Sequence, residues 1–146
     1  MKAFRFPLEK VLAWRRVQLE VEENKLRQLY ADAARLDRER AGWEAAGIRA
    51  EADVREWTSL AGRDLEALAA FRVYVKQQER ALSARRAECQ QRLASGQQAL
   101  LEARRRCRLL ERLRERRLAE WQAGNDREIE QLASESHLAG IVRRRA

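Results

Sequence analysis

The residues of this chain with the clearest potential for chemistry are the arginines between Arg104 and Arg117. This segment reads RRRCRLLERLRERR and holds eight arginines against two carboxylates, Glu111 and Glu115. Its surplus of six positive charges makes up most of the net charge of +8 that the chain carries. A guanidinium group presents several N–H donors in one plane, which match the oxygens of a phosphate or a carboxylate. The segment therefore predicts a binding site for an anionic surface.

No residue pattern in the chain predicts catalysis. Cys89 and Cys107 would lie roughly 27 Å apart on one helix, which is too far for a disulfide. We expect both to be small apolar residues of a helix interface in a reducing compartment. The single histidine, His137, has no second His or Cys beside it, so we expect no metal site. The sequence contains no glycine-rich phosphate loop, no HExxH motif and no nucleophile with a histidine at workable spacing. We therefore expect a protein that is not an enzyme and has no cofactor.

The composition predicts long helices to position these arginines. Charged residues make up 37% of the chain, which has six glycines and one proline. Ala, Leu, Glu, Arg and Gln are the residues that cost least free energy in a helix. We expect an all-α fold in which two long helices form an antiparallel coiled-coil hairpin. In this single domain of residues 1–146, helix one would span about 6–57, a turn about 58–64, helix two about 65–135 and a disordered basic tail about 136–146.

A repeat of 3.5 residues supports this hairpin. Alternating steps of three and four from Leu19 to Ala61 meet apolar residues at ten of thirteen positions. Such a period is typical of a coiled-coil seam. In helix two the seam would be looser, because Arg72, Glu79 and Arg86 interrupt it. Its apolar members there are Leu65, Leu68, Val75, Leu82, Cys89, Leu93, Leu100, Ala103, Cys107 and Leu110.

Three residues indicate where the helices begin and end. Pro7 is expected in the first turn of helix one, where its missing N–H costs nothing. Gly62 could take the left-handed conformation that ends helix one. Asp64 could accept the free N–H groups that open helix two. We therefore place the hairpin turn around these last two residues.

Folding back near Gly62 would bring the two most basic stretches together. Facing residues would then have numbers that sum to roughly 122, because antiparallel neighbours run in opposite directions. Arg15 and Arg16 would lie alongside Arg104–Arg108 and form one positive end. Residues beyond about 120 would have no partner in the chain, and they would expose an apolar stripe of Trp121, Ile129 and Leu132.

The arginine segment is expected to need a partner outside the chain. Arg112 has an arginine one turn before it and another one turn after it, and such like-charge pairs repel. Interleaved leucines such as Leu109 and Leu113 need burial, which favours an acidic protein surface over specific nucleic acid. Two alternatives stay open. One is a basic coiled coil associated with nucleic acid, and the other is an unrelated scaffold that forms dimers through the overhang.

The sequence also gives an expectation for the cellular compartment. No stretch approaches the roughly 20 apolar residues that span a bilayer. The first residues, MKAFRFPLEK, lack the apolar run of a signal peptide. We expect a cytosolic protein.

Two stretches follow patterns of a known family. Near the start, an F-x-F-x-L-E-x-V-L pattern places Phe4, Phe6, Leu8, Glu9, Val11 and Leu12. In the distal part, an E-A-R...L-E-x-L...R pattern followed by REIEQLA places Glu102, Ala103, Arg104, Leu110, Glu111, Leu113 and Arg117. Both patterns resemble the FliJ family, the small coiled-coil component of the bacterial flagellar type III export apparatus. The length and the expected hairpin agree with this family over nearly the whole chain.

The resemblance implies a coiled coil similar to the rotor stalk of rotary ATPases. Its open end would insert into the ring of the export ATPase FliI, and residues near the hairpin tip would contact the export gate protein FlhA and empty export chaperones. The protein would then be cytoplasmic and peripheral at the cytoplasmic face of the inner membrane. The ATPase-binding residues carried over to this chain would be Arg15, Arg16, Arg104, Arg105, Arg108, Arg112 and Arg116. The gate-binding residues would be Tyr74, Gln78 and Ala81, and Tyr74 also fits the seam near the turn, together with Phe71 and Val75.

Overall fold

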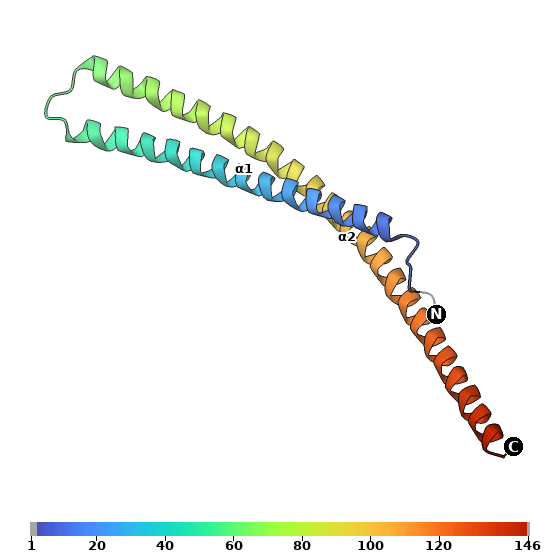
Figure 1. Cartoon of the computed structure of the whole chain (residues 1–146). Helices are drawn as coiled ribbons and strands as arrows, with labels where there is room; N and C mark the ends of the chain where they lie inside the picture. The colour runs from blue at the N-terminus through green and yellow to red at the C-terminus, as the bar shows by residue number, and fades with distance from the viewer. Residues whose placement is uncertain (1–2, 146) are drawn as a thin grey trace. The chain divides into compact units, whose positions relative to one another are not determined.

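Two helices make up nearly all of the computed structural model, which describes the backbone of residues 3–145 and the side chains of residues 3–144. Helix α1 spans Glu9–Glu56 and helix α2 spans Gly62–Arg145 (Figure 1). A short loop joins them, and the predicted all-α hairpin of two long helices is confirmed. The chain forms two compact units. Unit 1 comprises Met1–Glu20 and Glu102–Ala146, and unit 2 comprises Val21–Leu101.

The helices of unit 2 pack along the predicted seam. Heptad spacing is visible on α2, where Val75, Leu82 and Cys89 follow one another at intervals of seven and are all buried. The other buried residues of this seam are Leu26, Ala33, Leu93 and Leu100. Removing these side chains from water stabilises the pair of helices by roughly 25 cal/mol for each Å² of apolar surface. The seam does not reach the loop, since Leu65 is 53% exposed.

Two of the charged residues that interrupt the sequence pattern make ion pairs across the seam. Arg72 Nε lies 2.8 Å from Glu51 Oε1. Arg86 Nε lies 3.0 Å from Asp37 Oδ1. In both pairs the residue numbers sum to about 123, close to the predicted value. The long arginine side chains therefore bridge the helices at the edge of the seam, in the register that the sequence predicts.

The loop between the helices differs from the prediction at Gly62. Residues 57–61 form the loop, and Gly62 is the first residue of α2. None of the described residues has a left-handed backbone, so Gly62 does not end helix one in that conformation. The start of α2 is instead fixed by Asp64, whose carboxylate accepts the backbone N–H of Ala61 at 2.9 Å. This is half of a capping box, and it starts α2 three residues earlier than predicted.

The packing of unit 1 joins the N-terminal segment and the beginning of α1 to the distal part of α2. Leu12 is fully buried at its centre. The ion pair between Glu9 and Arg114, at 3.0 Å, and the one between Arg16 and Glu111, at 3.1 Å, connect the two helices. The core consists of Phe6, Leu12 and Cys107, with Phe4, Leu19, Leu110 and Leu113 packed against them.

Helix α1 begins at Glu9 rather than at about residue 6. The backbone N–H of Glu9 donates to the carbonyl of Phe6 at 3.2 Å, which closes a turn with Pro7 inside it. The first α-helical hydrogen bond then runs from Leu12 N–H to Leu8 O. Proline is favoured at the second position of such a turn because its φ angle is already fixed. Pro7 therefore precedes the helix, and the predicted position in its first turn is wrong.

Helix α2 continues through the segment predicted to be a disordered tail. It ends at Arg145, about ten residues beyond the predicted end. No proline follows Pro7, and the penalty for residues such as Gly140 is only about 1 kcal/mol each. Arg143 and Arg144 also lie in the last turn, where positive charge is favourable beside the helix C-terminus. The small penalty for glycine and the favourable positive charge in the last turn allow the helix to extend to its described end.

Candidate functional site

The exposed arginines of α2 in unit 1 form the most distinctive surface of the described chain. Arg108, Arg112 and Arg116 follow one another at intervals of four residues, so they lie along one side of the helix with Arg105 beside them. All four are exposed, whereas Cys107 is buried in the core. We call these four residues, Arg105, Arg108, Arg112 and Arg116, the arginine face. It is directed away from the core of unit 1.

The arginine face has no ion pair with the described residues of the chain. Other arginines of the same segment do have carboxylate partners at 3.0–3.1 Å. These pairs are Arg106 with Glu102, Arg114 with Glu9 and Arg117 with Glu120. Arg104, which is also exposed, makes an interaction within the chain and is not included in the face. Four positive charges thus remain available on the face for an anionic partner.

Arg15 and Arg16 are engaged in other contacts. The guanidinium of Arg16 donates from Nε and Nη2 to Glu111 Oε1, at 3.3 and 3.1 Å. This hydrogen bond is the main reason that the pKa of Arg16 is raised above its usual value. The guanidinium of Arg15 lies 4.7 Å from the centre of the Trp14 ring, a cation–π contact. The predicted positive end therefore contains two kinds of arginine. Those of the arginine face have no ion pair with the described residues, whereas Arg15 and Arg16 contact other residues, and Arg16 helps to hold the helices of unit 1 together.

Cys107 lies beside this ion pair. Its Sγ is 3.8 Å from Glu111 Oε1, and the side chain is 4% exposed. Burial raises the pKa of the Cys107 thiol, because the thiolate would lose its hydration, and the Glu111 carboxylate raises it further. A thiol that stays protonated is a weak nucleophile. Cys107 is thus a packing residue with little reactivity at neutral pH.

The three predicted gate-binding residues occupy the rim of the seam in unit 2. Tyr74 packs edge-on against Trp43, with ring centres 5.4 Å apart, and remains 46% exposed. Gln78 is half-buried and Ala81 is exposed. Val75, next to Tyr74, is the buried residue of the seam. Tyr74 therefore combines a packing contact with an accessible ring edge.

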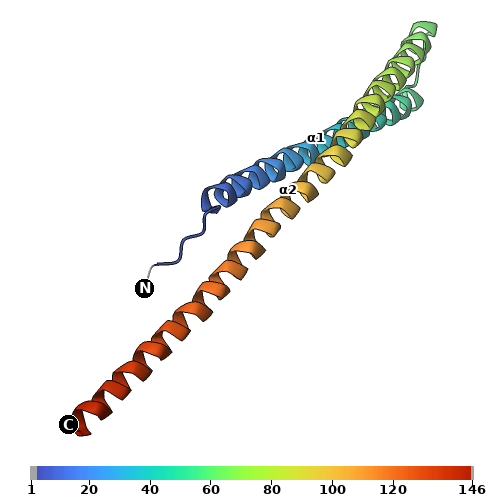
Figure 2. The same cartoon turned by 90° about the vertical axis from the view of Figure 1, so that its right-hand side faces the viewer.

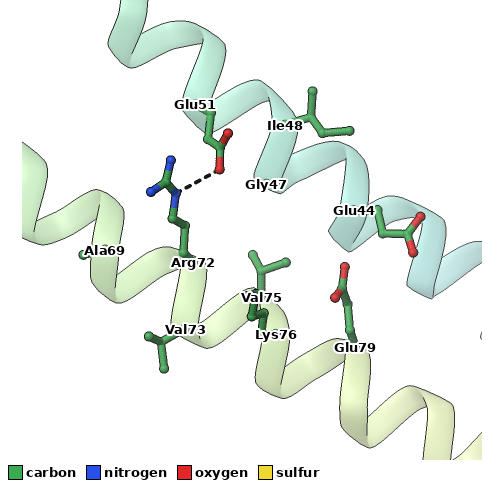
Figure 3. Close-up of a pocket in the computed structure, with 10 residues that line it drawn as sticks. All are labelled: Glu44, Gly47, Ile48, Glu51, Ala69, Arg72, Val73, Val75, Lys76 and Glu79. Atoms are coloured by element: carbon green, nitrogen blue, oxygen red, sulfur yellow. Dashed lines mark hydrogen bonds and ion pairs between the residues drawn. The ribbon is translucent and has the colours of Figure 1, made fainter.

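A groove of about 690 Å³ lies between the helices of unit 2, and the sequence reasoning missed it. Figure 3 shows Val75 pointing toward Gly47 of α1, with the ion pair of Arg72 and Glu51 beside them. Gly47 contributes no side chain to the lining of the groove, and a glycine at a seam position was the signal that could have found it. The lining residues are Glu44, Gly47, Ile48, Glu51, Ala69, Arg72, Val73, Val75, Lys76 and Glu79.

The apolar stripe predicted beyond residue 120 is only partly exposed in the way we expected. The Trp121 ring lies 6.0 Å from that of Phe4, so the N-terminal segment gives it a partner and the prediction that it has none is wrong. Ile129 and Leu132 are 47% and 59% exposed. The sequence could not indicate the Phe4 contact because Phe4 precedes the helix and follows no helical period.

Two further kinds of feature are absent from the described residues. No helix in this part of the chain combines the length and apolar character that crossing a membrane requires. No group of three or more His, Cys, Asp or Glu side chains among the described residues could hold a metal ion. No protein-family model, curated protein or solved structure matches the chain.

Proposed function

We propose that the chain is a non-enzymatic component of the bacterial flagellar protein export apparatus. In this proposal, unit 1 inserts into the ring of the export ATPase. Unit 2 contacts the export gate and the export chaperones through the surface around Tyr74, Gln78 and Ala81. The protein acts in the cytoplasm and is held at the inner membrane by these partners. The proposal rests on the resemblance of its terminal patterns to the FliJ family and on the arginine face.

The arginine face is the observation that carries this proposal. Its four guanidinium groups lie on one side of α2 and have no carboxylate partner among the described residues. Leu109, which is 58% exposed, lies beside them. An apolar side chain next to unpaired arginines suits a protein surface with acidic and apolar residues better than a phosphate backbone.

The proposed contact can be strong enough to engage a ring and weak enough to move within it. An exposed ion pair contributes only about 0–1 kcal/mol. Several such pairs hold a helix among the acidic loops of a ring, while any one of them breaks at little cost. This property suits a component that passes from one ATPase subunit to the next during turnover.

The proposal predicts that reversing the arginine face removes stimulation of the export ATPase. In the variant Arg105→Glu, Arg108→Glu and Arg112→Glu, like charges would oppose acidic ring loops. We expect stimulation of ATP hydrolysis to fall by at least about tenfold, as several charge pairs change from attraction to repulsion. The assay compares the hydrolysis rate of the purified ATPase with and without the protein.

A matched control separates charge at this face from net charge. The variant Arg38→Glu, Arg80→Glu and Arg85→Glu changes three exposed arginines of unit 2 and gives the same net charge. It should stimulate as the unchanged protein does, and circular dichroism should show equal helicity in all three proteins. Equal stimulation by both variants would contradict the proposal.

A further inference from the structure

A second heptad pattern runs along α2 in unit 1, on the side that carries the arginine face. Steps of three and four from residue 109 to residue 133 meet eight residues, all of which are exposed. They are Leu109, Arg112, Arg116, Ala119, Ala123, Asp126, Glu130 and Ala133. We call this set the outer stripe. A repeat of 3.5 residues on an exposed side of a helix suits contact with another helix.

The sign of the charges along the outer stripe changes from positive to negative at the level of Trp121, which is the midpoint of the stripe. Two small residues, Ala119 and Ala123, lie at equal distances on either side of this position. Five residues before Trp121 is Arg116, and five residues after it is Asp126. Nine residues before it is Arg112, and nine residues after it is Glu130. When two copies of the stripe lie antiparallel, each positive charge of one copy therefore faces a negative charge of the other.

These four charges are free to make contacts with a second molecule. Neither of the two arginines nor either of the two carboxylates has an ion pair with a described residue of the chain. In both views the terminal, red part of α2 has no other segment of unit 1 beside it (Figures 1 and 2). The packing of unit 1 uses the other side of the helix, through Cys107 and Leu110.

We propose that the outer stripe binds the outer stripe of a second copy of this chain, with the two α2 helices antiparallel and crossing at Trp121. Arg116 of one copy then faces Asp126 of the other, and Arg112 faces Glu130. Because the same contacts form twice about a two-fold axis, the interface contains four ion pairs. In an antiparallel coiled coil, an a position of one helix faces a d position of the other. Both pairs meet this requirement, because Arg116 and Glu130 occupy one of these positions and Arg112 and Asp126 occupy the other.

Charge complementarity selects a second copy over other partners. A uniformly acidic protein surface would match Arg112 and Arg116 but would repel Asp126 and Glu130. Duplex DNA would be repelled by the same two carboxylates. To match all four, a surface must change the sign of its charge over the ten residues from Arg116 to Asp126, which is about 15 Å along the helix at 1.5 Å per residue. The chain itself provides such a surface.

The alanines allow the two helices to approach closely at the centre. Ala119 and Ala123 have the smallest side chains that keep high helix propensity, so the helix axes can come within about 8 Å. The outer stripe contains only one large apolar residue, Leu109, and its ion pairs are exposed. We therefore expect weak, reversible association that decreases as salt is added.

This inference does not depend on the proposed function. It does connect with it, because Arg112 and Arg116 belong both to the arginine face and to the outer stripe. A copy held in the antiparallel pair would have these two arginines covered. The pair and the ring-bound form would then exclude each other, and the pair would be a storage form of the protein.

Charge exchange tests the pairing with the full-length chain. One variant carries Arg112→Glu and Arg116→Glu, which makes the outer stripe acidic on both sides of Trp121. A second variant carries Asp126→Arg and Glu130→Arg, which makes it basic throughout. We expect each variant alone to bind itself at least about tenfold more weakly than the unchanged protein. An equimolar mixture of the two should form a heterodimer, and the variant with all four exchanges should form a homodimer again.

Sedimentation velocity over a hundredfold range of concentration, at low and high salt, measures these affinities. Circular dichroism checks that every variant is as helical as the unchanged protein. Three outcomes would overturn the inference. These are an unchanged protein that stays monomeric at low salt, self-association that persists in both double variants, and a mixture that associates no better than its components. Persistence in the double variants would point to the exposed Ile129 and Leu132 instead.

Discussion

At the scale of single residues, the burial of Cys107 and its contact with Glu111 predict that a thiol in the most basic segment reacts slowly. Positive charge alone lowers the pKa of a cysteine and activates it. Here the Arg16 guanidinium acts in that direction, but burial and the Glu111 carboxylate act against it, and the pKa of Cys107 is raised. Sequence proximity to arginines therefore does not decide thiol chemistry. The local packing decides it.

This balance predicts slow alkylation of Cys107. In the variant Cys89→Ser, Cys107 is the single cysteine. Near pH 8 the protein should react with iodoacetamide at least about tenfold more slowly than a small free thiol, because less thiolate forms and the side chain is buried. In urea the rate should rise to that of the free thiol. Equal rates for folded and unfolded protein would contradict the assignment of Cys107 to the core.

The same pKa shift gives a sign for the pH dependence of stability. The folded state binds the thiol proton more tightly than the unfolded state does. The stabilisation is therefore complete below the usual thiol pKa of about 8.5, and it is lost as the pH rises through the higher folded value. We expect the urea midpoint of unfolding to fall more between pH 8 and pH 10 for Cys89→Ser than for Cys89→Ser with Cys107→Ala.

At the scale of the helices, the glycines of unit 2 show how packing modifies intrinsic propensity. A methyl group at Gly42 would have no atom within 4 Å. At Gly47 it would lie 3.6 Å from Val75 Cγ1, an ordinary contact. At Gly96 it would lie 3.2 Å from Leu26 Cδ1, which is tight. The same substitution thus tests helix propensity alone, propensity with a new contact, and propensity opposed by crowding.

We predict that Gly42→Ala and Gly47→Ala both stabilise the protein and that Gly96→Ala gains less. Alanine is favoured over glycine in a helix interior by about 1 kcal/mol. Gly47→Ala adds a contact with Val75 and should be the most stabilising of the three. Urea denaturation followed by circular dichroism measures the free energy of unfolding. A larger gain for Gly96→Ala than for Gly42→Ala would show that the seam near Leu26 is looser than described.

The seam was predictable from the sequence, and the details at helix ends were not. A repeat of 3.5 residues identifies buried positions such as Leu26 and Val75 without knowledge of their neighbours. The sequence does not show whether Gly62 ends the first helix or begins the second. The hydrogen bond from the Ala61 N–H to the Asp64 carboxylate places it at the start of α2. A pattern that averages over many residues cannot resolve one local bond.

The candidate site was predictable in composition but not in arrangement. The concentration of positive charge in the arginine segment is evident from the sequence. Four of the seven predicted ATPase-binding arginines form the arginine face. The sequence places Arg16 with them because it predicts the pairing of the two helices only approximately. A shift of one residue along a helix turns a side chain by about 100°. That rotation separates an arginine without a carboxylate partner from one that binds Glu111.

At the scale of the whole molecule, the net charge of +8 is the property that most invites an interpretation as a nucleic-acid-binding protein. Any protein of this charge binds DNA at low ionic strength, because counterions are released from the phosphates. From the arrangement of the charges we expect such binding to be nonspecific. The arginine face is followed on the same helix by Asp126 and Glu130, so a duplex lying along α2 would meet both signs of charge.

We therefore predict that duplex DNA binding is lost near physiological salt. About four phosphate contacts from the arginine face would make log K fall with log salt at a slope of about −3.6 for duplex DNA. Fluorescence anisotropy with a labelled duplex, titrated from about 20 to 200 mM salt, measures this slope. Arg105→Glu with Arg108→Glu should roughly halve it. Tight binding that survives 200 mM salt would support the nucleic-acid alternative, since nonspecific contacts alone cannot maintain it.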